Sequence, residues 1–197
     1  MVYKILDLPP IPEELLKFED RRLVSDIDTG YGLDHYKEGR KLIPCQYIIA
    51  QLFHTPLLDW LQTTLGMRQQ PRLAIQCQKL PPGVAETTHI VHTDILRNWC
   101  INYILDTGGG ARTTWYKERN RPLHRYRAIG QHQQSDTGFV NYSDLELLDS
   151  VCCRPRTWYL IPLTVLHDVD HITRHRFGLT ISLADMSDLK PELRIPL

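Results

Sequence analysis

Short apolar or alternating runs, separated by Pro, Gly and Asp, fill the chain from Arg72 onward. Runs of this length and punctuation are typical of β-strands. A helical segment followed by many short strands favours a β-sandwich or jelly roll with helices packed on one sheet. The runs are LAIQCQKL, NWCINYIL, RTTWYKE, HRYRAI, TWYLIPL and RFGLTISL.

The segment before these strands has a different period. From Pro44 to Leu65, apolar residues recur at roughly helical spacing, and Gly66 offers a C-terminal stop. We expect an amphipathic helix there, broken or kinked near Pro56.

The length of 197 residues suits one substantial core. We therefore predict a single domain over 1–197, mainly β with N-terminal helices. Residues 1–70 would form a helical N-terminal support, 71–185 the jelly-roll core and 186–197 a C-terminal tail.

The charge and cysteine content limit the partners and the cellular compartment that we expect for this protein. Lys plus Arg and Asp plus Glu number 23 each, so no global charge argues for binding nucleic acid or an anionic membrane. The N-terminus has charges and prolines where a secretory signal needs an apolar run, and no segment approaches a membrane span. We expect a soluble cytoplasmic protein with reduced thiols at Cys45, Cys77, Cys100, Cys152 and Cys153.

The last predicted strand, 174–183, has two contrasting faces. One face carries two arginines with Gly and hydroxyl residues, and the other is mostly apolar. If the apolar face meets the helices, the arginines line the sandwich interior, which is costly unless an anionic ligand or partner carboxylates satisfy them. The alternative is a half-exposed strand with its polar face in water.

His92-Thr93-Asp94 is a possible half of a metal site. In an extended stretch, residues two apart point the same way, so both side chains could reach one ion. Two imidazoles and one carboxylate on one face of an iron ion leave open positions for a co-substrate and dioxygen. A His-x-Asp tripeptide also arises often by chance, so it is weak evidence alone.

His167 offers the second half. It follows the apolar strand 157–163, and Arg176 lies on the next strand. A guanidinium there would stand across the site from the metal, and its planar fork suits a two-pronged pairing with a carboxylate.

In order and spacing, HTD, HDVD and RHRFGLTIS resemble the HxD…H…R signature of the 2-oxoglutarate/Fe(II) dioxygenases, particularly small prolyl-hydroxylase-like and phage-type members. The resemblance covers about Arg72 to Leu183. It implies a double-stranded β-helix (jelly roll, cupin-like), iron ligands at His92, Asp94 and His167, and a salt bridge from Arg176 to 2-oxoglutarate.

The resemblance also suggests further co-substrate contacts. Asn102 is the first choice for the keto-acid end of 2-oxoglutarate and Tyr116 the reserve, although either can be a core polar group. Thr180 and Ser182 either hydrogen-bond the co-substrate or fill space. Arg174 is the rival for the carboxylate role. His171 and His175 are weaker metal candidates: the first leaves too short a link to Arg176, and the second faces the other way.

The implied activity is hydroxylation of an amino acid, a peptidyl residue or a small metabolite, using Fe(II), 2-oxoglutarate and O2. The rivals are a cupin-like metal-binding protein without oxygenase activity, and a phage accessory or structural protein. The polar stretch Lys117–Tyr142 reads in part as a long excursion between strands, which suits a substrate loop or plain disorder. Its four arginines, at 119, 121, 125 and 127, suit an acidic or polypeptide substrate, or simply a solvated loop. The sequence leaves substrate and oligomeric state open.

Overall fold

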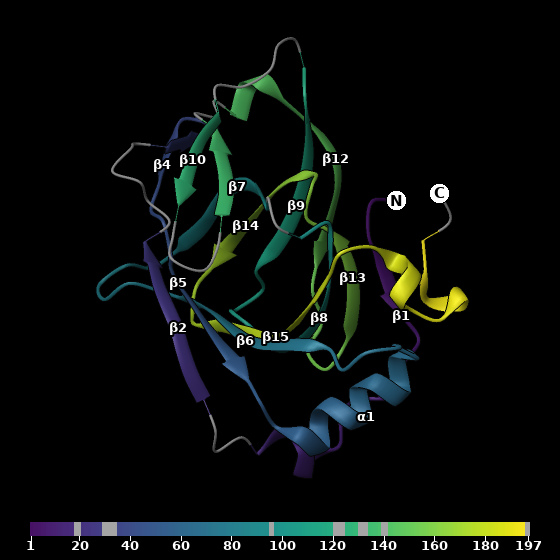
Figure 1. Cartoon of the computed structure of the whole chain (residues 1–197). Helices are drawn as coiled ribbons and strands as arrows, with labels where there is room; N and C mark the ends of the chain where they lie inside the picture. Colours follow the sequence, from purple (N-terminus) through teal and green to yellow (C-terminus); the bar gives the residue numbers. More distant parts are fainter. Residues whose placement is uncertain are drawn as a thin grey trace.

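The computed structural model describes residues 1–17, 21–28, 35–94, 97–119, 125–129, 134–138 and 142–195. Two antiparallel sheets face each other (Figure 1). The first has seven strands, in the spatial order β1 (Lys4–Leu6), β13 (Trp158–Pro162), β8 (Trp99–Thr107), β15 (Arg176–Leu183), β6 (Arg72–Lys79), β5 (Gln46–Leu52) and β2 (Arg21–Asp28). The second has six, in the order β10 (Arg125–Ile129), β11 (Gln134–Gly138), β7 (Thr87–Asp94), β14 (Leu166–Ile172), β9 (Arg112–Glu118) and β12 (Leu145–Cys152).

The chain passes back and forth between these sheets. Strands β6, β8, β13 and β15 lie in the seven-stranded sheet, while β7, β9, β12 and β14 lie in the six-stranded sheet. The fold is therefore mainly β, and this alternation is consistent with a jelly-roll-like arrangement. Side chains alternate along each strand, so every strand sends one set of residues between the sheets and another set outward.

The prediction of N-terminal helices is wrong for most of residues 1–70. The only α-helix among the described residues is α1 (Thr55–Leu65), preceded by a short 3-10 turn at Glu13–Leu16. The first part of the expected helix is strand β5, whose QYIIAQL sequence is rich in residues that favour strands. Pro56 lies in the first turn of α1, where a missing N–H leaves no hydrogen bond unmade.

Helix α1 covers the outer side of the seven-stranded sheet (Figure 1). Gly66 ends the helix as predicted, with the left-handed φ of 66° that glycine adopts without strain. The apolar residues of β15 belong to the same core as the helix, as the alternation of the last strand predicts. This core includes Leu57, Leu61 and Leu65 of α1, Leu179, Ile181 and Leu183 of β15, and Met186, Leu189 and Leu193 of the C-terminal segment.

Two hairpins border the six-stranded sheet. Strands β3 (His35–Lys37) and β4 (Arg40–Leu42) pair with each other. Strands β10 and β11 lie within the predicted excursion 117–142, and β11 pairs with β7 at Thr93 and Asp94. Arg121, with residues 120–124, 130–133 and 139–141 of that excursion, lies outside the described residues.

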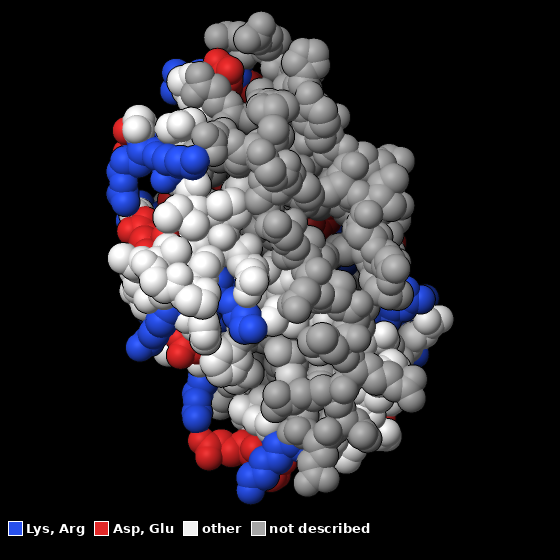
Figure 2. All heavy atoms as spheres, turned by 90° about the vertical axis from the view of Figure 1, so that its left-hand side faces the viewer, with Lys and Arg blue, Asp and Glu red and all other residues white. Residues whose placement is uncertain are grey.

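The remaining segments complete the described chain. Short 3-10 turns occupy Tyr142–Asp144, Met186–Asp188 and Pro191–Leu193. No helix among the described residues is long and apolar enough to cross a membrane. On the face shown in Figure 2, the described Lys and Arg side chains are interspersed with Asp and Glu and form no continuous patch of one sign.

Candidate functional site

Strands β7 and β14 bring the predicted metal ligands together inside the sandwich. His92 and His167 are Cα partners in the antiparallel pair, and their ring centroids lie 4.4 Å apart. Asp94 follows two residues after His92, so its carboxylate shares the inward face. Its Oδ1 lies 3.8 Å from His92 Nε2. All three side chains are buried, as a metal site shielded from bulk water requires.

Both imidazoles are held in the same way by the backbone. His92 Nδ1 lies 2.7 Å from the carbonyl oxygen of Ile90, and His167 Nδ1 lies 2.8 Å from that of Val165. A carbonyl oxygen only accepts, so each Nδ1 carries the proton and each Nε2 keeps a free lone pair. Burial lowers the pKa of His92, and it lowers the pKa of His167 to about 4. Both rings are therefore neutral at pH 7 and competent as metal ligands.

Asp94 has a partner that sequence reasoning missed. Arg97 Nε donates to Asp94 Oδ2 at 3.0 Å, and Arg97 Nη2 contacts the same oxygen. Burial by itself raises the pKa of Asp94, but Arg97 and the two histidines lower it overall. The carboxylate is thus ionised, with Oδ1 left on the side of His92. A basic residue three positions after the HxD aspartate was the available signal.

The chemistry of these three side chains suits a divalent metal. Their donor atoms, however, lie farther apart than the ligand atoms of a formed metal site. Within the described residues, no group of three or more His, Cys, Asp or Glu side chains has the arrangement needed to hold a metal ion. The 3.8 Å between His92 Nε2 and Asp94 Oδ1 exceeds the roughly 3 Å expected for two ligands about 2.1 Å from one ion. Two free Nε2 lone pairs and one carboxylate oxygen nevertheless lie close together on two neighbouring strands of one sheet.

Arg176 lies across this space, on the seven-stranded sheet. It is only 5% exposed and has no carboxylate partner among the described residues. Its Nη1 donates to Gln78 Oε1 at 2.8 Å, its Nη2 has only a 3.9 Å contact with Cys153 Sγ, and its Nε has no hydrogen-bond partner. Of the two alternatives for the last strand, the structure has the inward-facing one. A buried guanidinium without a counter-ion is costly and marks a place for an anion.

The turn after β8 allows Arg176 to lie there. Gly108 has a left-handed φ of 73°, and a Cβ at that position would stand 2.6 Å from Arg176 Cβ. The Gly108 carbonyl accepts from the backbone of Thr173 and Arg174, which fixes the start of β15. A glycine is therefore required for both the turn and the close approach.

Gln78 and His89, neither singled out by the sequence, connect Arg176 to the imidazoles. The guanidinium only donates, so the Gln78 oxygen faces Arg176 and its NH2 group faces His89 Nδ1, at 2.9 Å. His89 Nδ1 then accepts, and its proton resides on Nε2. Burial, together with neighbouring His92, lowers the pKa of His89 well below its ordinary value. Its ring lies 4.3 Å from that of His92 and 4.9 Å from that of Tyr47.

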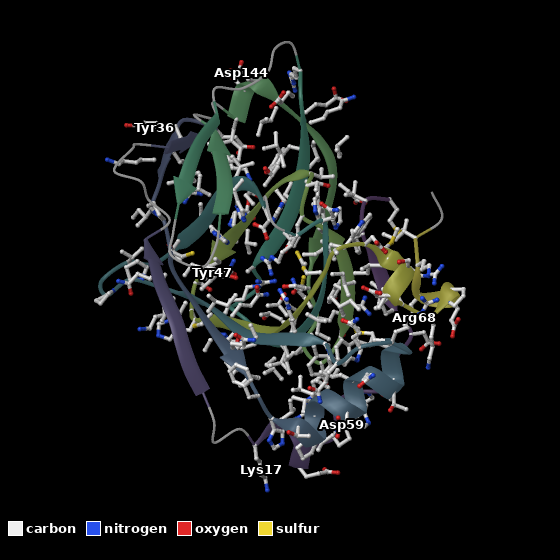
Figure 3. The ribbon with its side chains drawn as sticks, viewed as in Figure 1. Lys17, Tyr36, Tyr47, Asp59, Arg68 and Asp144 are labelled. Atoms are coloured by element: carbon white, nitrogen blue, oxygen red, sulfur yellow. The ribbon has the colours of Figure 1, made fainter. Side chains whose placement is uncertain are left out.

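These groups enclose a small cavity between the sheets. Its volume is about 50 Å³, and both sheets contribute to its wall. Tyr47, labelled in Figure 3, spans the gap: it comes from β5 and stacks on His89 of β7. The other lining residues are Gln76, Gln78, His92, Asp94, Arg97, Cys100, Asn102, Thr113, Ile161, Leu163, His167, Val169 and Arg176.

Three of the remaining predicted residues lie near this cavity. Asn102 is buried, lines it and accepts a contact from Cys100 Sγ. Ser182 accepts from Arg97 Nη1 at 3.3 Å, which places it behind Asp94. Thr180 is buried on the same face of β15 as Arg176, though it is not in the cavity wall.

Four others lie elsewhere. Tyr116 is on the outer face of β9, where its hydroxyl donates to Asp168, because residues 114 and 116 point away from the inward 113. Arg174 is exposed beside Asp106, since it precedes β15 and follows the turn outward. His171 is exposed near Glu86, and His175 accepts from the Leu80 backbone. Of the two arginines, Arg176 lines the cavity and Arg174 does not.

This chain has only distant similarity to known proteins. No protein-family model matches the sequence, and neither does any curated protein. One similar solved structure is an oxidoreductase of the 2OG-Fe(II) oxygenase family from Burkholderia pseudomallei (TM-score 0.40, 10% identity, covering 86% of this chain and 75% of that chain). Another is E. coli ycfD (TM-score 0.42, 13% identity, 95% of this chain and 56% of that chain). This chain therefore spans just over half of the second protein. Likeness at this level assigns neither a fold nor an activity to this chain.

Proposed function

We propose that this protein is an Fe(II)- and 2-oxoglutarate-dependent oxygenase that hydroxylates an amino acid, a peptidyl residue or a small metabolite. The observation that carries the proposal is the buried, carboxylate-free Arg176 on one sheet, facing two neutral histidines and an ionised aspartate on the other. A dicarboxylic acid that reaches from a metal at the histidines to this guanidinium would satisfy both groups.

In this proposal each residue has a defined task. His92, Asp94 and His167 hold Fe(II), and Arg176 pairs with the distal carboxylate of 2-oxoglutarate. Asn102 would meet the keto-acid end, and its position in the cavity wall supports this role. Bound Fe(II) and 2-oxoglutarate supply the oxidising chemistry: O2 is consumed, 2-oxoglutarate is decarboxylated to succinate and CO2, and one oxygen atom enters a substrate C–H bond.

The protein's own contribution is positioning and exclusion of water. The carbonyls of Ile90 and Val165 fix the imidazole tautomers. Gln78 holds Arg176 from behind, and Arg97 fixes Asp94 through one oxygen. The cavity between the two sheets is small, about 50 Å³, which limits the water that can share it with a ligand.

The fold agrees with these tasks. In a double-stranded β-helix of this family the ligands lie between the sheets, and here they line a cavity between the six- and seven-stranded sheets. The β10–β11 hairpin pairs with β7 at Asp94, so this part of the 117–142 excursion borders the proposed metal site. It is the natural candidate for substrate contacts.

A second function has two observations in its favour. Arg97 neutralises Asp94, and the three ligands stand too wide for a finished metal site. Both features suit a protein that keeps the fold without the chemistry, such as a phage accessory or structural protein. A cupin-like protein that binds metal alone is the intermediate case, because it has no use for a buried Arg176.

Anaerobic titration with Fe(II) and then with 2-oxoglutarate separates these possibilities. The oxygenase binds both, the cupin-like protein binds metal alone and the accessory protein binds neither. Succinate formation, screened across amino acids and peptides with Fe(II), 2-oxoglutarate and O2, then tests turnover. His167→Ala and Arg176→Gln are the controls. Metal uptake without any 2-oxoglutarate binding would refute the oxygenase proposal.

A further inference from the structure

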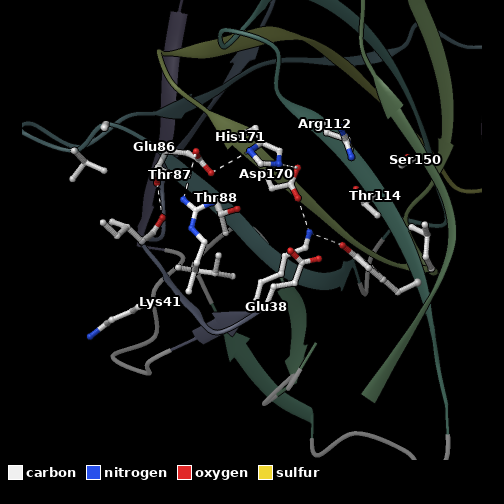
Figure 4. Close-up of a pocket in the computed structure, with 18 residues that line it drawn as sticks. Glu38, Lys41, Glu86, Thr87, Thr88, Arg112, Thr114, Ser150, Asp170 and His171 are labelled. Carbon is white, nitrogen blue, oxygen red and sulfur yellow. Dashed lines mark hydrogen bonds and ion pairs between the residues drawn. The ribbon is translucent and has the colours of Figure 1, made fainter. Parts of the chain in front are cut away.

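A larger hollow lies on the other side of the six-stranded sheet. Its volume is about 530 Å³, within the range of small-molecule sites. Figure 4 shows its walls: the β3–β4 hairpin, the segment 84–88, and the outward faces of β9, β12 and β14. It shares no lining residue with the cavity at His92 and His167, because the two lie on opposite faces of the same strands.

The floor of this hollow holds polar atoms without partners. Asp170 and Thr114 are 7% and 4% exposed, and both line it. Asp170 Oδ1 and Thr114 Oγ1 are buried and have no hydrogen-bond partner among the described residues. Asp170 Oδ1 has only a 3.8 Å ion-pair contact with His171 Nε2, and Asp170 Oδ2 accepts from Lys37 Nζ at 2.5 Å. Burying an acceptor without a donor is unfavourable. The floor therefore calls for a ligand with hydrogen-bond donors.

Beside the floor stands an unpaired cation. Arg112 is the Cα partner of Asp170, which places the two side chains about 5 Å apart on the outer face. Opposite charges at such positions usually pair, yet Arg112 has no ion pair with any described residue. Lys37 Nζ already pairs with Asp170 Oδ2. The Arg112 guanidinium is left for an anionic group of a ligand.

The mouth of the hollow is apolar. Leu42, Ile43, Val84 and Leu147 line it, and Ile43 and Leu147 are 44% and 60% exposed. Large exposed aliphatic side chains at the rim of a polar floor suit the apolar part of an amphipathic ligand.

We propose that this hollow binds a free α-amino acid with an apolar side chain. The ammonium group would donate to Asp170 Oδ1 and Thr114 Oγ1, the carboxylate would pair with Arg112, and the side chain would lie against Ile43 and Leu147. An ammonium and a carboxylate attached to one carbon can reach two side chains as close together as those of Asp170 and Arg112, which are Cα partners. The proposal is independent of the oxygenase function, since it uses none of its residues.

The groups of the floor disfavour two other ligands. A dicarboxylate such as 2-oxoglutarate brings no hydrogen-bond donor for Asp170 Oδ1, although Lys37, Arg40, Lys41 and Arg112 also line the hollow. A metal cation would compete with Lys37, whose ammonium already lies 2.5 Å from Asp170 and 3.2 Å from Asp168.

Isothermal titration of the full chain with leucine tests the proposal, with N-acetyl-leucine and leucinamide as probes that lack the ammonium or the carboxylate. Leucine should bind saturably. Each blocked form should bind at least about tenfold more weakly, because each loses a charge-assisted hydrogen bond. Arg112→Gln should weaken leucine by a similar factor, and Thr114→Val, which keeps the shape, by about threefold to tenfold.

Two controls keep the test specific. Arg72→Gln alters an exposed arginine at the start of a different strand and should leave leucine binding unchanged. His167→Ala should also leave it unchanged, which separates this site from the metal ligands. The proposal would be overturned if leucine showed no saturable binding. It would also be overturned if N-acetyl-leucine and leucinamide bound as tightly as leucine, or if Arg112→Gln bound leucine as tightly as the wild type.

Discussion

The two faces of β14 handle buried charge in opposite ways. Outward, Asp168 and Asp170 share Lys37, and Asp168 also accepts from the hydroxyls of Tyr116 and Tyr142. Inward, His167 meets a second neutral imidazole, and the nearest arginine across the cavity has no carboxylate. The outer cluster supplies its own counter-ion, as groups that stabilise a fold do. The inner cavity pairs Asp94 with Arg97 but leaves Arg176 without a carboxylate among the described residues, as expected of a site that a ligand completes.

The largest effect should come from breaking the outer cluster. Lys37→Met leaves Asp168 and Asp170 without their ammonium, which should lower the free energy of unfolding by roughly 3–5 kcal/mol. Urea denaturation measures it. Arg40→Met is the matched control, because its ion pair with Glu86 is 3.8 Å long and exposed, and its loss should change the free energy by less than about 1 kcal/mol. Equal losses in the two variants would show that the cluster is not a structural unit.

Next in size is removal of an inner imidazole. His167→Ala should weaken Fe(II) binding roughly 100-fold, about 2.7 kcal/mol, since one of three ligands is gone. Anaerobic Fe(II) titration measures the affinity, and circular dichroism checks the fold. Lys37→Arg, which keeps the outer charge, should leave Fe(II) affinity unchanged. If His167→Ala bound iron as tightly as wild type, the inner group would not be the metal site.

A third substitution should have opposite effects on stability and binding. Arg176→Met removes a buried cation without a counter-ion, so the free energy of unfolding should stay unchanged or rise by up to about 2 kcal/mol. The same variant should lose 2-oxoglutarate binding while keeping Fe(II). Urea denaturation and calorimetry give the two readouts. A clear loss of stability would mean that Arg176 is satisfied within the fold and serves structure.

The smallest effect should come from Gln78. Gln78→Leu frees Arg176 and His89 from their shared amide and should weaken 2-oxoglutarate about tenfold, near 1.4 kcal/mol. If Gln78 acts only by holding Arg176, the Gln78→Leu substitution should not weaken 2-oxoglutarate binding further in the Arg176→Met background. Additive losses in the double variant would instead assign Gln78 a contact of its own.

The sequence predicted the inner site better than the outer one. Alternation along the strand put Arg176 on the face opposite Leu179 and Ile181, because that rule needs only residue order, and the structure turns the Arg176 face inward. The two halves of the metal group were found through spacing, although the role of each residue stays a prediction. Gln78 was missed because hydrogen bonds between strands depend on register, which a single sequence does not give. Arg97 was missed although it lies only three residues after Asp94, because spacing alone does not show where its side chain points.

The errors have physical causes. Residues 46–52 were assigned to a helix because their apolar spacing fits both periods, and the β-branched content decided for a strand. Tyr116 was placed in the site because it lies on the correct strand, but its position one residue out of phase turns it to the outer face. The outer hollow gave no sequence signal, since hairpin β3–β4 meets β14 only through tertiary contacts.

Anaerobic absorption spectroscopy of the Fe(II)-loaded protein tests the central claim most directly. Chelation of ferrous iron by 2-oxoglutarate produces a visible charge-transfer band. In the wild type, the band should grow to saturation as 2-oxoglutarate is added, with one iron per chain. His167→Ala should not develop the band. Arg176→Met should need a far higher 2-oxoglutarate concentration to develop it. A wild-type protein that takes up no iron, or whose band is indifferent to Arg176→Met, would contradict the assignment of His92, Asp94, His167 and Arg176.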